Sequence, residues 1–170
     1  MAPELHALIR EDNFRKFAMK TNHYVHLAAM AILSFVSMYF LMYSMTYSAG
    51  DVYNNLNQLY MAGLMTAPMV IIELGFMRHM FTNRRLNMAI LVASVVAGVG
   101  FFMLIQKQAA IGDTQFLRSM IPHHSSAVLM CEEALLTDSR IRDLCRAIVA
   151  NQRSEIGQMK EILENPPTRP

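Results

Sequence analysis

Two adjacent histidines, His123 and His124, follow a methionine and a proline in the last third of this 170-residue chain. Imidazole and thioether groups together suit a soft ion, Cu(I) above all, whereas Cu(II) would accept imidazole and carboxylate. Adjacent helical residues point about 100° apart, so we do not expect both rings to point straight at one core. One ring can lie over Met120, and the other can face a neighbouring helix.

Polar residues recur on the helical stretch that follows. Gln152, Glu155 and Met159 share a stripe that otherwise carries Ile148. Buried polar groups cost free energy unless they are paired or bind a ligand. The alternative to a metal site is that both histidines are hydrogen-bonded core or surface residues and that the methionines serve packing.

The two cysteines of the chain, Cys131 and Cys145, lie symmetrically about residue 138, where we expect a turn. Each would lie about 10 Å along its helix from that turn, so the two would be at the same level. If both face the partner helix, they can form a disulfide or a shared thiolate site. Outside the cytoplasm we favour the disulfide, and two separate core cysteines are the third alternative.

These residues would be positioned by a helical hairpin over 113–164. Apolar residues recur every three or four positions on both sides of the polar run 137–139, which predicts a turn and a new helix start. Asp113, after Gly112, predicts the start of the first of these helices, with its carboxylate accepting backbone N–H groups. A hairpin of this size buries little, so we expect it to complete a four-helix bundle by dimerisation or to pack on another surface.

The remainder of the chain predicts a membrane region. Hydrophobic residues make up 54% of the sequence and charged residues 16%, against roughly 25% charged in an average soluble domain. Three apolar windows, at 25–47, 59–77 and 86–105, have about the length that a membrane-spanning helix needs. We therefore expect an all-α protein with these parts: a cytoplasmic segment 1–24, a membrane domain 25–105, a linker 106–112, the soluble hairpin 113–164 and a Pro-rich tail 165–170.

Positive charge near the ends of the windows predicts the orientation in the membrane. The loop 48–58 has no Lys or Arg, whereas the N-terminal segment and the second loop carry Arg10, Arg15, Lys16, Lys20, Arg78, Arg84 and Arg85. The positive-inside rule then predicts a cytoplasmic N-terminus and a hairpin outside the cytoplasm, which in a bacterium is the periplasmic side of the inner (plasma) membrane.

A second set of candidate residues lies inside the predicted spans. Met61, Met65, Met69, Glu73 and Met77 follow at steps of four, and Met38, Met42 and Met45 form another stripe. An ionisable group within a span indicates function, so a methionine and carboxylate path for a soft metal is one interpretation. The interpretation we favour is that methionine replaces leucine in helices that face lipid. Small residues four apart, such as Gly63 and Ala67, favour helix packing.

The hairpin resembles the domain of unknown function 305 family, whose members include CopM-like extracytoplasmic copper-binding proteins built as four-helix bundles. The resemblance lies in the run from Asp113 to Phe116, Met120 with its histidine pair, Ala127, Met130, the run from Gln152 to Ile156, and Met159. It implies that copper is the cofactor and that Met120, His123, His124, Met130 and Met159 are ligand candidates, beside Glu155 on the same stripe. Only one hairpin is present, so a bundle would have to form between chains, and the chain lacks an additional Met/His-rich tail.

We therefore expect a membrane-anchored protein that binds Cu(I) outside the cytoplasm for buffering, resistance or hand-off to a metal-handling partner protein. The alternative is a metal-free helical module that dimerises or docks in a membrane complex. The net charge of +2 without a long basic run gives no reason to expect nucleic acid as a partner, which leaves membrane lipid and a second copy of the chain. We do not expect an enzyme, because the sequence has no Glu-x-x-His pair, His-Glu-x-x-His motif or Gly-rich phosphate loop.

Overall fold

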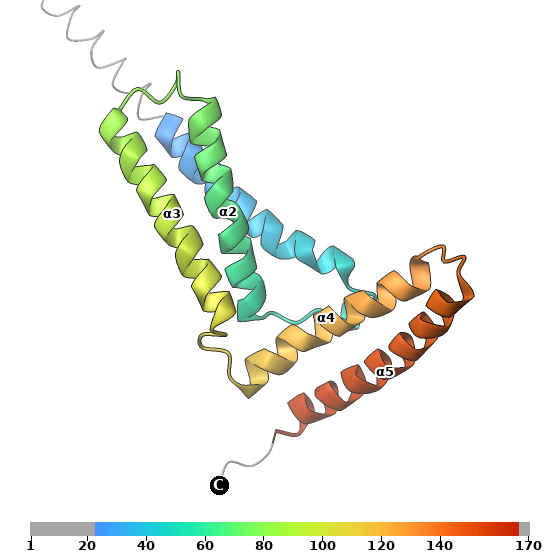
Figure 1. Cartoon of the computed structure of the whole chain (residues 1–170). Coiled ribbons are helices and arrows are strands. Elements are labelled where there is room, and N and C mark those ends of the chain that lie inside the picture. Colours follow the sequence, from blue (N-terminus) through green and yellow to red (C-terminus); the bar gives the residue numbers. More distant parts are fainter. Residues whose placement is uncertain (1–22, 167–170) are drawn as a thin grey trace, which may run out of the picture. The chain divides into compact units, whose positions relative to one another are not determined.

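The computed structural model describes residues 23–166, and this part of the chain is all-α, as predicted. A first helix covers residues 23–41 and is followed by two short 3₁₀ helices, η1 (Met42–Met45) and η2 (Ala49–Asp51). Four longer helices come next: α2 (Leu56–Phe76), α3 (Arg84–Gln106), α4 (Asp113–Glu133) and α5 (Ser139–Glu164) (Figure 1). Most of the predicted cytoplasmic segment and most of the predicted tail lie outside the described residues.

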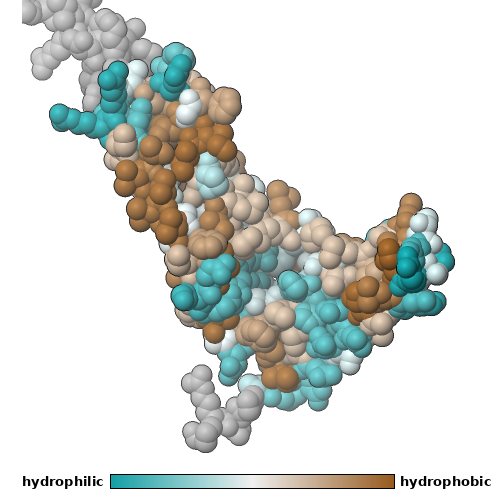
Figure 2. All heavy atoms as spheres, in the orientation of Figure 1, coloured by the Kyte–Doolittle hydropathy of each residue, from teal (hydrophilic) through white to brown (hydrophobic). Residues whose placement is uncertain are grey.

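Three stretches are long and apolar enough to cross a membrane, judged by length and composition. They are His23–Met45, Leu56–Phe76 and Arg84–Gln106, and they overlap the three windows predicted from the sequence. Many apolar side chains of α3 are exposed, among them Val92, Val95, Val96 and Val99. Figure 2 shows hydrophobic residues gathered over this helix.

The described residues form two compact units. The first combines residues 23–38 with Ala62–Met103, and the second combines Tyr39–Met61 with residues 104–166. The second unit thus contains the predicted hairpin together with the loop that precedes α2. The domain borders expected from the sequence remain a prediction.

The first unit has a small apolar core and a close helix contact. Leu27, Leu74 and Phe81 are buried together. A Cβ atom placed on Gly63 of α2 would lie 2.5 Å from ring atoms of Phe101 of α3, so the small residue lets the Phe101 ring lie against α2. At the start of α3, the Asn83 side chain accepts a hydrogen bond from the Leu86 N–H at 3.2 Å.

The second unit is built on the antiparallel hairpin of α4 and α5, which lie side by side (Figure 1). Ile121, Ile156 and Met159 form its buried core. Asp138 caps α5, because its carboxylate accepts a hydrogen bond from the Arg140 N–H at 2.8 Å, as the polar run in the sequence predicted.

The predicted cap of α4 is wrong in one respect. Gly112 is the N-cap residue, and it makes no side-chain hydrogen bond. Asp113 already belongs to the first helical turn, where its carboxylate interacts favourably with the positive end of the helix dipole instead of capping.

Candidate functional site

A cavity of about 300 Å³ lies within the second unit, between η1, the first turns of α2 and the middle of α4. Four thioether groups and one imidazole line it, from Met42, Met45, Met61, Met120 and His123. We call this cavity the methionine pocket. The rest of its lining is one proline and the amides and hydroxyls of Asn55, Asn57, Gln58, Thr46, Ser119 and Ser126. None of these described lining residues is an acid, a lysine, an arginine or a cysteine.

Local helix geometry explains why these sulfur and nitrogen atoms, the candidate metal ligands, face one cavity. Met42 and Met45 are three residues apart on a 3₁₀ helix, in which residues at that spacing eclipse each other. Met120 and His123 are three residues apart on α4, so they share one helix face. Each pair therefore presents two candidate metal ligands in the same direction. Met61 of α2 is the fifth candidate ligand.

The start of α2 is fixed by side chains that surround the pocket. The Gln58 N–H donates to the Asn55 side-chain oxygen at 2.8 Å, and the Leu56 N–H donates to the side-chain oxygen of Gln115 on α4 at 3.1 Å. These bonds satisfy backbone donors that a helix start leaves unpaired. They also tie the beginning of α2, and with it Met61, to α4.

His124 lies in different surroundings from His123. Its ring is buried, with Nδ1 2.9 Å from the Met120 carbonyl oxygen and Nε2 2.7 Å from Oε2 of Glu155 on α5. A carbonyl oxygen only accepts, so Nδ1 carries a proton and donates it. The contact at Nε2 then needs one more proton, held by the imidazole or by the Glu155 carboxyl. Both ring nitrogens of His124 are engaged in this arrangement.

The remaining predicted ligands do not join either histidine. Met130 is 53% exposed on α4, and Met159 is packed into the hairpin core. Among the residues that the structure describes, no three His, Cys, Asp or Glu side chains lie close enough to hold a metal ion together. The predicted set Met120, His123, His124, Met130, Glu155 and Met159 is therefore divided among the pocket, the hydrogen bond between His124 and Glu155, the surface and the core.

The predicted membrane stripe is divided as well. Met61 lines the methionine pocket, whereas Met65 is exposed and Met77 packs against the core of the first unit. Met69 and Glu73 are partly buried on α2. The sequence signal that was available for the pocket is the pair Met42 and Met45, which we assigned to a stripe in the first span.

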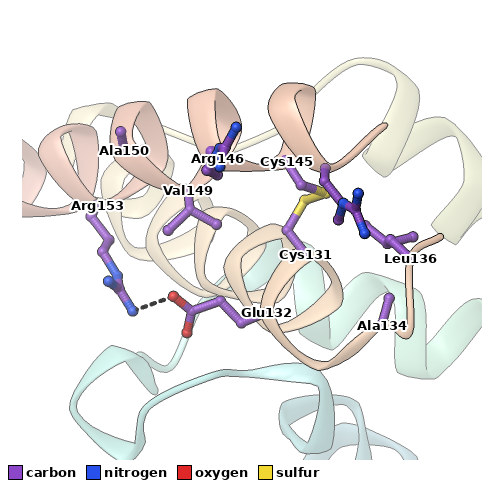
Figure 3. A pocket seen from close by; sticks show the side chains of 10 residues that line it. Cys131, Glu132, Ala134, Leu136, Cys145, Arg146, Val149, Ala150 and Arg153 are labelled. Carbon is purple, nitrogen blue, oxygen red and sulfur yellow. Dashed lines mark hydrogen bonds and ion pairs between the residues drawn. A yellow bond between two sulfur atoms is a disulfide. The ribbon is translucent and has the colours of Figure 1, made fainter. Parts of the chain in front are cut away.

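Cys131 and Cys145 are joined by a disulfide, with 5.2 Å between their Cα atoms. It links α4 to α5 near the turn of the hairpin and borders a second cavity of about 500 Å³, which Figure 3 shows from close by. Beside it, Arg153 donates to Glu132 at 2.7 Å, and its guanidinium lies 5.5 Å from the centre of the Tyr47 ring. A hydrogen bond with Glu132 raises the pKa of Tyr47.

Comparison with known proteins adds two similarities. Residues 103–164 match the family model described as domain of unknown function 305. A protein of Acanthamoeba polyphaga mimivirus, named only as uncharacterised, is 34% identical over 140 residues, which are 79% of this chain and 89% of that protein. No solved structure matches the chain.

Proposed function

The chain belongs to the same protein family as the uncharacterised mimivirus protein and carries a domain of unknown function 305 over residues 103–164, and from this premise we propose that it is a membrane-anchored protein that binds copper as Cu(I). The methionine pocket carries the proposal. It combines four thioethers with one imidazole, which are donors that favour Cu(I) over harder ions.

The neutrality of the pocket adds a reason for a monovalent ion. A divalent ion would bring two positive charges into a cavity whose described lining has no carboxylate or thiolate to compensate them. Charge that no neighbouring group compensates is costly to remove from water, and the cost rises with the charge. Cu(I) brings one charge and accepts neutral ligands, so we expect binding of Cu(I) and weak binding of Zn(II) and Cu(II).

We further propose that the three long apolar helices span the inner (plasma) membrane, with the N-terminus in the cytoplasm and the hairpin on the periplasmic or extracellular side. The absence of Lys and Arg from the loop 48–58, against three arginines in 78–85, supports this orientation. The disulfide between Cys131 and Cys145 supports it independently, because disulfides persist in oxidising compartments. The protein would there buffer Cu(I), confer resistance or pass the ion to a metal-handling partner, without acting as an enzyme.

The test is a competitive titration of the full chain in detergent with Cu(I) and a Cu(I) chelator. We compare the wild type with the double variant Met120→Leu/His123→Ala, which removes two donors of the pocket. The matched control is Met88→Leu/His79→Ala, in which the same residue types change at exposed positions outside the pocket.

We expect tight binding by the wild type and by the control, and a loss of about tenfold or more in affinity in the pocket variant, as for removal of a metal-site group. Absence of binding in the wild type would contradict the proposal. Equal affinities in the pocket variant and the control would move the metal site away from Met120 and His123.

A metal-free docking or dimerisation module is the second candidate function. It is favoured by apolar side chains exposed on the hairpin, with Leu135 fully exposed and Leu144 60% exposed. A homodimer of the full chain that binds no Cu(I), detected by light scattering in detergent, would favour this function. Dissociation of that dimer by Leu144→Glu would locate the interface on α5.

A further inference from the structure

Asp51, in η2, is a buried acid with both carboxylate oxygens engaged by the hairpin. Oδ2 accepts a hydrogen bond from Oγ of Ser125 on α4 at 2.6 Å, and Oδ1 accepts one from Nζ of Lys160 on α5 at 2.6 Å. Only 6% of the Asp51 surface is exposed, and Ser125 is fully buried. Asp51 therefore binds the loop before α2 to both helices of the hairpin at once.

The Ser125 hydroxyl extends this contact to the backbone. It has a single proton, and an ionised carboxylate can only accept, so that proton is committed to Asp51. The hydroxyl oxygen is then oriented to accept the hydrogen bond from the Tyr47 N–H, which measures 3.0 Å. Asp51 thus fixes the position of Tyr47 through Ser125.

Tyr47 stands two residues after Met45, the nearer of the two pocket methionines on η1. The 3₁₀ helix η1 directly continues the helix over 23–41 and buries none of its residues, so contacts with other segments decide how it lies against the hairpin. The hydroxyl of Tyr43 does donate to the Tyr53 carbonyl oxygen at 2.7 Å, but Tyr53 belongs to the same loop as Asp51. The Gln58 side chain also donates to the Tyr39 carbonyl oxygen at 2.8 Å, just before η1. The contacts that join this loop to the hairpin act together with that bond to decide where Met42 and Met45 lie.

A role in packing alone does not account for a charge in this position. Burying the Asp51 carboxylate costs desolvation that an apolar residue would avoid, and its partner Lys160 is only partly buried. The paired contacts of Asp51 with Ser125 and Lys160 can supply register, because both form in one arrangement of the loop and the hairpin. Asp51 joins Ser125 two residues beyond the pocket ligand His123, so the register that it sets is that of the pocket.

We propose that Asp51 is a positioning residue of the methionine pocket. It fastens the segment 42–51 to the hairpin and thereby keeps Met42 and Met45 beside Met120 and His123. The consequence for Cu(I) rests on the proposed function, whereas the attachment of the segment can be tested without metal.

The experiment uses the full chain in detergent and compares Asp51→Ala with the wild type. The control is Asp143→Ala, which removes an acid of the same unit whose partner, Arg146, is exposed. Hydrogen exchange of the metal-free protein follows the amide of Tyr47 and those of α5. Competitive titration gives the Cu(I) affinity, and X-ray absorption of the Cu(I)-loaded protein gives the number of sulfur ligands.

In Asp51→Ala we expect exchange at Tyr47 to be faster by about tenfold or more, as for the loss of a partly buried hydrogen bond. The amides in the middle of α5 should keep their wild-type exchange rates, which shows that the hairpin is folded. Cu(I) should bind more weakly and with fewer sulfur ligands, whereas Asp143→Ala should match the wild type in all three measurements.

Ser125→Ala is the second variant, because it removes the hydrogen bond from the Tyr47 N–H to the Ser125 hydroxyl and leaves the ion pair of Asp51 with Lys160. It too should expose the Tyr47 amide to exchange. Unchanged exchange at Tyr47 in both variants would overturn the inference. If the wild type binds Cu(I) and both variants keep its affinity and its number of sulfur ligands, the inference is also overturned, whereas the proposed function is not contradicted. A wild type that binds no Cu(I) would instead overturn the proposed function. Hydrogen exchange at Tyr47 alone would then test whether Asp51 attaches the segment 42–51 to the hairpin.

Discussion

The rings of His123 and His124 lie 6.0 Å apart between their centres, yet they belong to different environments. His124 is buried and bridges the Met120 carbonyl oxygen and the Glu155 carboxyl, whereas His123 is exposed on the face of α4 that lines the methionine pocket. The turn of about 100° between adjacent helical residues separates them. One histidine thus holds the two helices of the hairpin together, and the neighbouring one is free to bind a ligand.

We predict that His124→Ala destabilises the protein and that His123→Ala does not. The first substitution removes a buried group that joins α4 to α5 and leaves the Glu155 carboxyl without this partner, so we expect a loss of about 1–3 kcal/mol in the free energy of unfolding. His123→Ala changes an exposed side chain and should stay within about 0.5 kcal/mol of the wild type. Chemical unfolding of the full chain in detergent, followed by circular dichroism, measures both. Equal losses in the two variants would contradict the division of roles.

Helix positions could be predicted from the sequence because they depend on local patterns. Apolar windows of the length of a membrane span gave the first three long helices, and the polar run around Asp138 gave the start of α5. The angle between adjacent residues of a helix also predicted that His123 and His124 would separate. Asp113 was misassigned because the capping preference of Asp and its preference for the first helical turn differ by one position only.

The methionine pocket could not be predicted because its donors are brought together by tertiary contacts. Met42 and Met45 are more than 70 residues from Met120 in the sequence, and no local pattern connects them. Asp51 and Ser125, whose hydrogen bonds join this segment to the hairpin, carry no motif. The resemblance to the domain of unknown function 305 family led to Met120 and His123 as candidates, but it covers only the hairpin and so omits η1 and α2, which supply the other methionines of the pocket.

We predict that the disulfide contributes strongly to the stability of the hairpin. It joins residues 14 apart in the sequence, and cross-linking a loop of about this length contributes about 3 kcal/mol in the chain-entropy view. Cys131→Ser/Cys145→Ser should therefore unfold at a lower denaturant concentration than the wild type under non-reducing conditions. The same comparison in the presence of a reductant is the control, because the difference should then largely disappear. A difference that survives reduction would show that the serines themselves, and not the lost cross-link, destabilise the hairpin.

We predict that Gly63 cannot be enlarged without disturbing the contact between α2 and α3. A Cβ atom there would lie 2.5 Å from the Phe101 ring, so the ring must move, and overpacking of this kind costs about 1–3 kcal/mol. Gly75 lies on the same helix with nothing within 4 Å of an added Cβ atom, which makes Gly75→Ala the matched control. Thermal unfolding of the full chain in detergent should show a lower midpoint for Gly63→Ala only. A midpoint for Gly63→Ala equal to that of Gly75→Ala would show that Phe101 adapts at little cost.

We predict that the cap of α5 makes stability depend on pH through Asp138. A hydrogen bond from the Arg140 side chain, with another from the Arg140 N–H, holds the pKa of the Asp138 carboxyl below its ordinary value of 3.8. A carboxyl whose pKa is lowered by folding stabilises the folded state above the unfolded pKa, and this contribution is lost as the pH falls through the folded pKa.

The charge can be separated from the cap by Asp138→Asn, because asparagine also caps helices but does not ionise. The wild type should unfold at a higher temperature than this variant at neutral pH, and the two midpoints should converge as the pH falls below about 3.8. Thermal unfolding of the full chain, followed by circular dichroism over a series of pH values, gives both curves. A gap between the curves that stays constant or widens on acidification would assign the effect of Asp138 to a cause other than its ionised contact with Arg140.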